Sequence, residues 1–247
     1  SSFEGCFRCF MNYREIKPHI RDLGRGMFFL FLLFMLKNGE VWGQGEGLEA
    51  RNNFYSALRV DPNFVLANLY VNEPDPQQRR KYRQAAVDNK SSASEAERIQ
   101  VEMWEAGRDG KSSEKLQLAK DLVNKYPNSS EAHLELGIVY TNRFMFDEAI
   151  GSFKAATKLN PDQFDAWREL AQHHVVVGNN NMLPKERQSK ELVIKYTEEM
   201  IRSRPKAPNA YQYRANIERQ YSNFEGAKPL YQKMVDVVNE TGSSAKS

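Results

Sequence analysis

Two prolines set the repeat length of this chain. Pro127 and Pro161 are 34 residues apart, and between them apolar side chains recur at helical spacing rather than in the alternation of strands. After Gln44, prolines and glycines divide the rest of the sequence into further helical segments. A pair of helices of this length cannot bury its apolar face alone, so such units fold by stacking on one another. We therefore predict an all-α chain built from stacked helix–turn–helix units.

The clearest unit covers residues 130–161. On each of its two helices, small, apolar and aromatic residues share one face. The small residues allow the two helix backbones to approach closely, and the aromatic residues fill the space beside them. The closing proline suits the first turn of the next helix, where a missing N–H costs nothing. These positions are Leu136, Gly137, Tyr140, Ala149, Phe153, Ala156 and Pro161.

At these positions the unit resembles the tetratricopeptide repeat, and the chain resembles exported bacterial proteins of that family. The resemblance implies a right-handed α-solenoid over residues 44–240. It would hold about five to six repeats, most of them less regular than residues 130–161. The polar residues 241–247 are expected to form a disordered tail.

A short apolar run lies near the N-terminus. The residues from Met27 to Leu36 are all apolar, which is too short for a bilayer span of roughly 20 residues but matches the core of a signal peptide. Basic residues precede the run, and Gly43 supplies a small residue for cleavage. Residues 1–43 are therefore predicted to be a signal peptide or leader of a periplasmic or secreted protein. Two alternatives stay open: a buried helix packed on the first repeat, or a retained anchor that holds the protein to a membrane.

Composition and motifs exclude several classes of function. The 247 residues include 35 Lys and Arg against 32 Asp and Glu, a net charge of +3, which is too balanced for a dedicated nucleic-acid binder. The basic residues 79–83 are predicted to form a solvated helix face. Cys6 and Cys9 are the only cysteines, and His173 and His174 point about 100° apart on a helix. We predict that these imidazoles are packed in the core, and that the chain has no metal site, no cofactor and no enzymatic activity.

The resemblance also implies where a partner binds. In tetratricopeptide arrays the first helices of successive repeats line a concave groove. Leu134 and Ile138 stand where the family's co-chaperones carry the Lys and Asn that clamp chaperone tails, which argues against that partner. Arg168 and Arg219 are expected to be solvent-accessible and to capture a peptide carboxylate or backbone carbonyls. The full set of carried-over groove positions is Leu134, Ile138, Asn142, Arg168, Gln172, Val175, Gln212, Asn216 and Arg219.

These observations predict a scaffold that binds a partner protein or an extended peptide in its groove. Amide and arginine side chains suit a peptide, whose backbone offers both donors and acceptors. Membrane contact is expected only if residues 27–36 are retained, and no contact with nucleic acid is expected. The alternative is that the chain is the repeat-containing part of a larger membrane-anchored transcription or signalling regulator.

Overall fold

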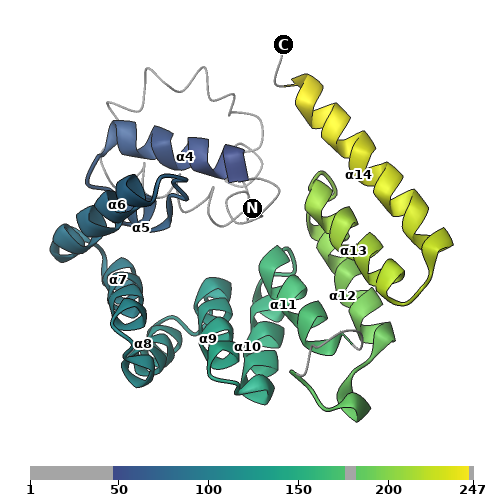
Figure 1. Cartoon of the computed structure of the whole chain (residues 1–247). Coiled ribbons are helices and arrows are strands. Elements are labelled where there is room, and N and C mark those ends of the chain that lie inside the picture. Colours follow the sequence, from purple (N-terminus) through teal and green to yellow (C-terminus); the bar gives the residue numbers. More distant parts are fainter. Residues whose placement is uncertain (1–46, 176–181, 245–247) are drawn as a thin grey trace, which may run out of the picture. The chain divides into compact units, whose positions relative to one another are not determined.

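The computed structural model describes residues 47–175 and 182–244, and in this part of the chain every regular element is a helix (Figure 1). The chain divides into a unit of residues 1–40 and a unit of residues 41–247. The predicted leader, with its run from Met27 to Leu36, lies outside the described residues. Within the described ranges, no helix combines the length and the hydropathy that crossing a bilayer requires.

The helices follow one another as antiparallel neighbours, and each packs mainly on the helices before and after it in sequence. The pairs are α5 with α6, α7 with α8, α9 with α10, α11 with α12, and α13 with α14. This arrangement is an all-α solenoid of tetratricopeptide-like helix pairs, as the sequence predicts. The bounds are α4 (Gly47–Val60), α5 (Val65–Tyr70), α6 (Pro76–Asp88), η1 (Lys90–Ser92), α7 (Glu95–Arg108), α8 (Ser112–Lys125), α9 (Ser130–Asn142), α10 (Phe146–Leu159), α11 (Phe164–His174), η2 (Lys185–Arg187), α12 (Lys190–Ser203), α13 (Pro208–Gln220) and α14 (Phe224–Ser244).

The start of each first helix that follows a proline is held by the same hydrogen bond. The side chain six residues after the proline donates to the proline carbonyl oxygen, at distances between 2.8 and 3.0 Å. Because this bond recurs at a constant offset, it fixes the rotation of the first helices of four pairs in the same way. The bonds join Asn68 to Pro62, His133 to Pro127, Trp167 to Pro161 and Tyr211 to Pro205.

The α7–α8 pair has no proline at this place and begins with a capping box instead. Ser94 Oγ accepts a hydrogen bond from the Glu97 backbone N–H at 3.4 Å, and the Glu97 carboxylate accepts one from the Ser94 N–H at 2.8 Å. Two of the orphan donors at the helix start are thereby satisfied. The Ser and Glu three residues apart thus form the capping box that fixes the start of α7.

Complementary sizes let the two helices of a pair pack closely. Gly137 on α9 lies against the fully buried ring of Phe153 on α10, and a Cβ atom added to Gly137 would lie 2.4 Å from Phe153 Cε1. In the preceding pair the large residue is on the first helix and the small one on the second, since Met103 of α7 and Ala119 of α8 belong to one core cluster. One large and one small residue therefore fill the same place in both pairs.

One detail differs from the sequence-based expectation. Residues 241–244, expected to belong to a disordered tail, continue the helix α14 as far as Ser244, while residues 245–247 lie outside the described residues. Pro229 lies inside α14, five residues after Phe224.

The glycines of the α9–α10 pair provide a test of this packing. Gly137→Ala should lower the free energy of unfolding by about 1–3 kcal/mol, because the added methyl group overpacks the Phe153 ring. Gly151→Ala, on the exposed face of α10 with no atom near the added Cβ, should instead raise it by up to about 1 kcal/mol, since alanine is the better helix former. Urea unfolding of the two variants measures both changes. Effects of the same sign would contradict the helix–helix contact described here.

Candidate functional site

Several of the predicted groove residues belong to the core. Leu134 and Ile138 are half-buried and pack against the cluster that contains Leu170 and Ala171 of α11. Val175 is 7% exposed and lies in a cluster with Val193 and Ile217. These three side chains fill space between helices of neighbouring pairs. Their role in a partner-binding groove stays a prediction, and the structure adds that all three also take part in packing between helices.

Asn216 is also engaged inside a pair. Its side-chain oxygen accepts a hydrogen bond from Tyr231 Oη of α14 at 2.7 Å, so it lies toward the second helix of its own pair. Gln172 is half-buried on α11, and Asn142, Gln212 and Arg219 are exposed. These last four residues stay predicted contacts for a partner.

Arg168 is not the free cation that the sequence suggested. Its Nη1 atom lies 2.7 Å from Asp165 Oδ1, and its Nη2 atom donates to Glu169 Oε1 at 3.1 Å. The Asp165 side chain is 7% exposed and that of Arg168 is 28% exposed. The guanidinium therefore balances two carboxylates of its own helix, and its predicted contact with a partner stays a prediction.

The structure shows another row of side chains that the sequence analysis missed. Eight residues after each of the four prolines, the first helix carries a tyrosine or a glutamate, and all four side chains are half-buried. At one end of the row, Tyr70 Oη donates to Gln100 Oε1 of α7 at 2.8 Å. We call this row, with the Asp165–Arg168 ion pair beside it, the first-helix seam. Its residues are Tyr70, Gln100, Glu135, Asp165, Arg168, Glu169 and Tyr213.

The offset from the proline was the signal that could have revealed this row. Glu135, Glu169 and Tyr213 each follow directly after a residue that the sequence analysis chose for the groove. One residue along a helix is a rotation of about 100°. Three of the predicted groove positions therefore lie one residue, or about 100° of rotation, away from this row.

Ionisable groups along the seam act on one another across helices. Burial raises the pKa of Glu135, and this effect is opposed by Lys115 and reinforced by Asp165. Burial also raises the pKa of Asp165, although Arg168 and Arg204 lower it. Burial removes these carboxylates from bulk water, and the neighbouring cations offset its effect on their pKa values only in part.

A tyrosine lies at each end of the first-helix seam, Tyr70 on α5 and Tyr213 on α13. Burial raises the pKa of Tyr213 to about 12, and the Glu169 carboxylate adds to the shift. Burial and the Glu135 carboxylate hold the pKa of Tyr70 well above its usual value. Electrostatic coupling therefore runs from α5 through α9 and α11 to α13.

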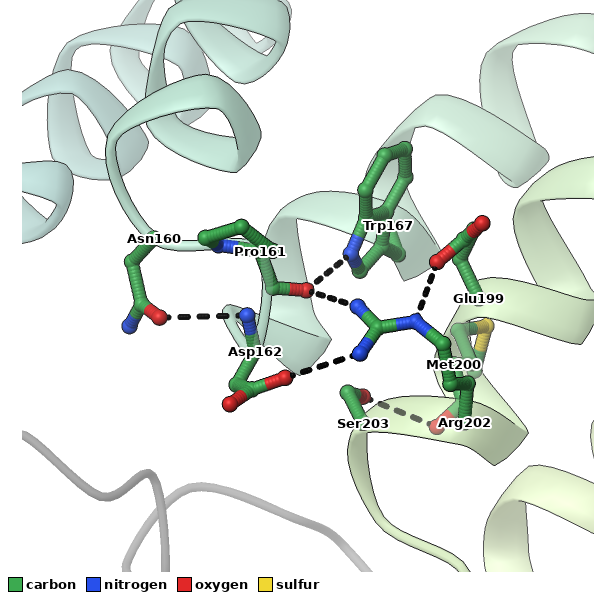
Figure 2. A network of polar contacts seen from close by, with 8 residues as sticks. All are labelled: Asn160, Pro161, Asp162, Trp167, Glu199, Met200, Arg202 and Ser203. Atoms are coloured by element: carbon green, nitrogen blue, oxygen red, sulfur yellow. Dashed lines mark hydrogen bonds and ion pairs between the residues drawn. The ribbon is translucent and has the colours of Figure 1, made fainter.

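A polar network fixes the start of α11, which carries much of the seam (Figure 2). The Pro161 carbonyl oxygen accepts hydrogen bonds from Trp167 Nε1 at 2.8 Å and from Arg202 Nη2 at 2.7 Å. Arg202 also pairs with Asp162 at 3.1 Å and with Glu199 at 2.6 Å. The turn before α11 is thereby tied to the last turn of α12, and this holds the helix that positions Asp165, Arg168 and Glu169.

Both histidines of α11 are packed, as the sequence predicts. His173 is fully buried between the rings of Phe146 and Phe153, and its Nδ1–H donates to the Glu169 carbonyl oxygen at 2.7 Å. His174 donates from Nδ1 to the Arg187 carbonyl oxygen at 3.2 Å. Among the described residues, no three His, Cys, Asp or Glu side chains are grouped closely enough to hold a metal ion.

Comparison with known proteins gives matches to solved structures only. No family model matches the chain, and no curated protein matches it. The chain is similar to a crystal structure of MamA, with a TM-score of 0.45 and 18% identity over 81% of this chain and 93% of that one. A second MamA structure, MamA MSR-1 C2, has a TM-score of 0.47 and 14% sequence identity, over 76% of this chain and 99% of that one. The structure of YrrB, described as a TPR protein with an unusual peptide-binding site, has a TM-score of 0.44 and 15% sequence identity. The match covers 74% of this chain and 91% of that one.

Removing the seam cation should destabilise the protein. Arg168→Ala should lower the free energy of unfolding at neutral pH by about 1–3 kcal/mol, because the nearly buried Asp165 carboxylate loses its partner. The raised pKa of Asp165 means that the native state takes up a proton before the unfolded state does. The loss should therefore shrink as the pH falls toward the pKa of Asp165.

The control for this variant is Arg187→Ala, which removes an exposed ion pair with Asp147. It should change stability by less than about 0.5 kcal/mol at any pH. Chemical denaturation of both variants at several pH values tests the prediction. A pH-independent loss in Arg168→Ala would mean that lost packing, rather than an uncompensated carboxylate, is responsible.

Proposed function

We propose that this protein is a non-enzymatic scaffold that binds a partner protein or an extended peptide along the first-helix seam. The observation that carries the proposal is the row of half-buried polar side chains at one offset in four helix pairs. A side chain that serves the core alone has no need of a carboxylate at this place, because burying a charge costs free energy. As part of the same proposal, the protein is exported and its predicted leader is removed.

The repeat geometry suits an extended chain. Neighbouring packed helices lie roughly 8–10 Å apart, and an extended peptide rises about 3.3 Å per residue. An extended peptide would therefore advance about three residues over the distance between two directly packed helices. Packing of α9 on α11 is fixed by the contact of Thr141 Oγ1 with His173 Nε2 at 3.1 Å, so this part of the seam is preorganised.

The proposal is tested by selecting peptides of about twelve residues from a random display library on the full chain. Gln172 lies three residues after Glu169 of the seam and so on the same face of α11. Selected peptides should bind Gln172→Ala roughly five- to tenfold more weakly, because about 1 kcal/mol of hydrogen bonding to the peptide backbone is lost. Lys154→Ala, on the exposed face of α10, should leave their affinity unchanged. Fluorescence anisotropy with labelled peptides measures both. Weakening by Lys154→Ala without weakening by Gln172→Ala would place binding on the second helices and refute the proposal.

A further inference from the structure

We propose that Phe144 of one copy of this chain inserts into an aromatic-lined pocket of a second copy, so that the protein associates with itself head to tail. This contact goes beyond the proposed function, because neither surface belongs to the first-helix seam, and the two proposals can fail independently. The pocket is formed by residues of α4, of the turn after it and of α6: Tyr55, Leu58, Arg59, Pro62 and Tyr82.

The turns inside three helix pairs share one backbone geometry. At the end of the first helix, one residue donates its N–H to the carbonyl three positions earlier, and the next N–H donates to the carbonyl five positions before it. The first of these two residues has a positive φ, which is 70° at Gly110, 59° at Phe144 and 60° at Ser222. Glycine adopts this left-handed conformation freely, whereas a bulky side chain is strained in it. Phe144 stands 34 positions after Gly110 and so occupies a place where the turn favours glycine.

Phe144 is also exposed to an unusual degree. At 80%, it is the most exposed large apolar residue among those that the structure describes. A Cβ atom added to Gly110, at the same place of the preceding turn, meets no atom within 4 Å, so a side chain here points away from the fold. A residue that is both strained and exposed contributes little to folding, and such outliers gather at functional sites. Phe144 thus has the properties of an anchor that fills a partner's pocket.

The ring of Phe144 is held in a defined position. It packs against the ring of Phe146, with the ring centroids 6.1 Å apart and the ring planes at 90°. The turn itself is tied to the preceding pair, since Arg143 Nη1 donates to Ser112 Oγ of α8 at 2.9 Å. A side chain that is already fixed loses less conformational freedom on binding, which favours its use as an anchor.

The receiving pocket has the size and the lining for an aromatic ring. It encloses about 440 Å³, within the range of roughly 300–1,000 Å³ that is typical of ligand pockets. The rings of Tyr55 and Tyr82 line it, with centroids 6.3 Å apart and planes inclined at 52°. The Tyr55 hydroxyl donates a hydrogen bond to the Glu73 carboxylate, which fixes this ring. An inserted phenylalanine would meet aromatic faces and edges, and such contacts between aromatic rings are favourable.

The charges beside the two surfaces are complementary. Asp147 and Glu148 follow Phe144 in the first turn of α10 and are exposed, while Arg59 is an exposed cation of the pocket lining. Asp147 pairs with Arg187. Within the described ranges, neither Glu148 nor Arg59 forms an ion pair. A second copy therefore supplies both the anchor and a carboxylate of the sign that the pocket attracts, which favours it as the occupant.

The arrangement determines how the copies assemble. Each copy carries one anchor and one pocket on different helices, so the contact is heterologous and can repeat from copy to copy. One inserted aromatic side chain gives a small interface. Association should therefore be weak, and the average mass should exceed that of a monomer at about 100 μM but not at about 1 μM. Sedimentation velocity of the full chain over this concentration range measures it.

Two variants each remove one side of the contact. Phe144→Gly should weaken self-association at least about tenfold and remain folded, because glycine adopts this φ without strain. Arg59→Glu should have a similar effect, since it brings a carboxylate into the apolar contact. Two controls should leave association unchanged. They are Phe224→Ser, which removes another exposed phenylalanine, and Arg80→Glu, on an exposed position of α6 that does not line the pocket. Circular dichroism checks that all four variants are folded.

Mixing the two contact variants tests the head-to-tail geometry. Phe144→Gly keeps its pocket and Arg59→Glu keeps its phenylalanine, so the mixture should form a one-to-one complex that grows no further. A mixture that stays monomeric would overturn the inference, and so would a wild-type chain that stays monomeric at the higher concentration. Equal weakening by Phe144→Gly and Phe224→Ser would indicate unspecific adhesion of exposed rings and would also overturn it.

Discussion

The bond from a side chain to the proline carbonyl six residues earlier sets the rotational phase of the solenoid. Every later position of a first helix follows from it, because a helix is rigid once its first turn is fixed. With the phase constant, residues at offset eight fall in one row, as Glu135 and Glu169 do. The donor is an amide, an imidazole, an indole or a phenol in the four pairs. The interaction is therefore conserved in geometry while the residue type changes, and a pattern of residue types alone does not reveal it.

The α7–α8 pair shows what happens when this constraint is absent. Its start is fixed by the Ser94 capping box rather than by a proline, and the side chain of Gln100 still reaches Tyr70 of the preceding first helix. In its core the large residue, Met103, is on the first helix and the small one, Ala119, is on the second, the reverse of the α9–α10 pair. Different local devices thus preserve one stacking arrangement, since each pair must offer its neighbours a compatible apolar face.

Sequence periodicity was sufficient to predict the helix pairs, because Pro127 and Pro161 mark the pair boundaries and the apolar spacing is helical. It was less able to predict which polar residues face a partner. Leu134 and Ile138 looked available only because an isolated helix does not show how far the next pair covers it. Arg168 looked free because Asp165, three residues earlier, was not recognised as its partner. The leader prediction for residues 1–43 lies outside the described residues and stays a prediction.

The composition of the seam is more easily explained by binding than by stability. Seven residues after the proline, two of the four first helices carry a leucine, Leu69 and Leu134, and α13 carries the exposed Gln212. In α11 the same position is Arg168, and it brings two carboxylates with it. Replacing such a buried ionic group by apolar residues is often neutral or stabilising, so the ion pair is not needed to hold α11 in place. That task is already performed by the Pro161 network (Figure 2) and by the packed His173. We therefore connect the charge at this position with the binding proposed for the seam rather than with the folding of α11.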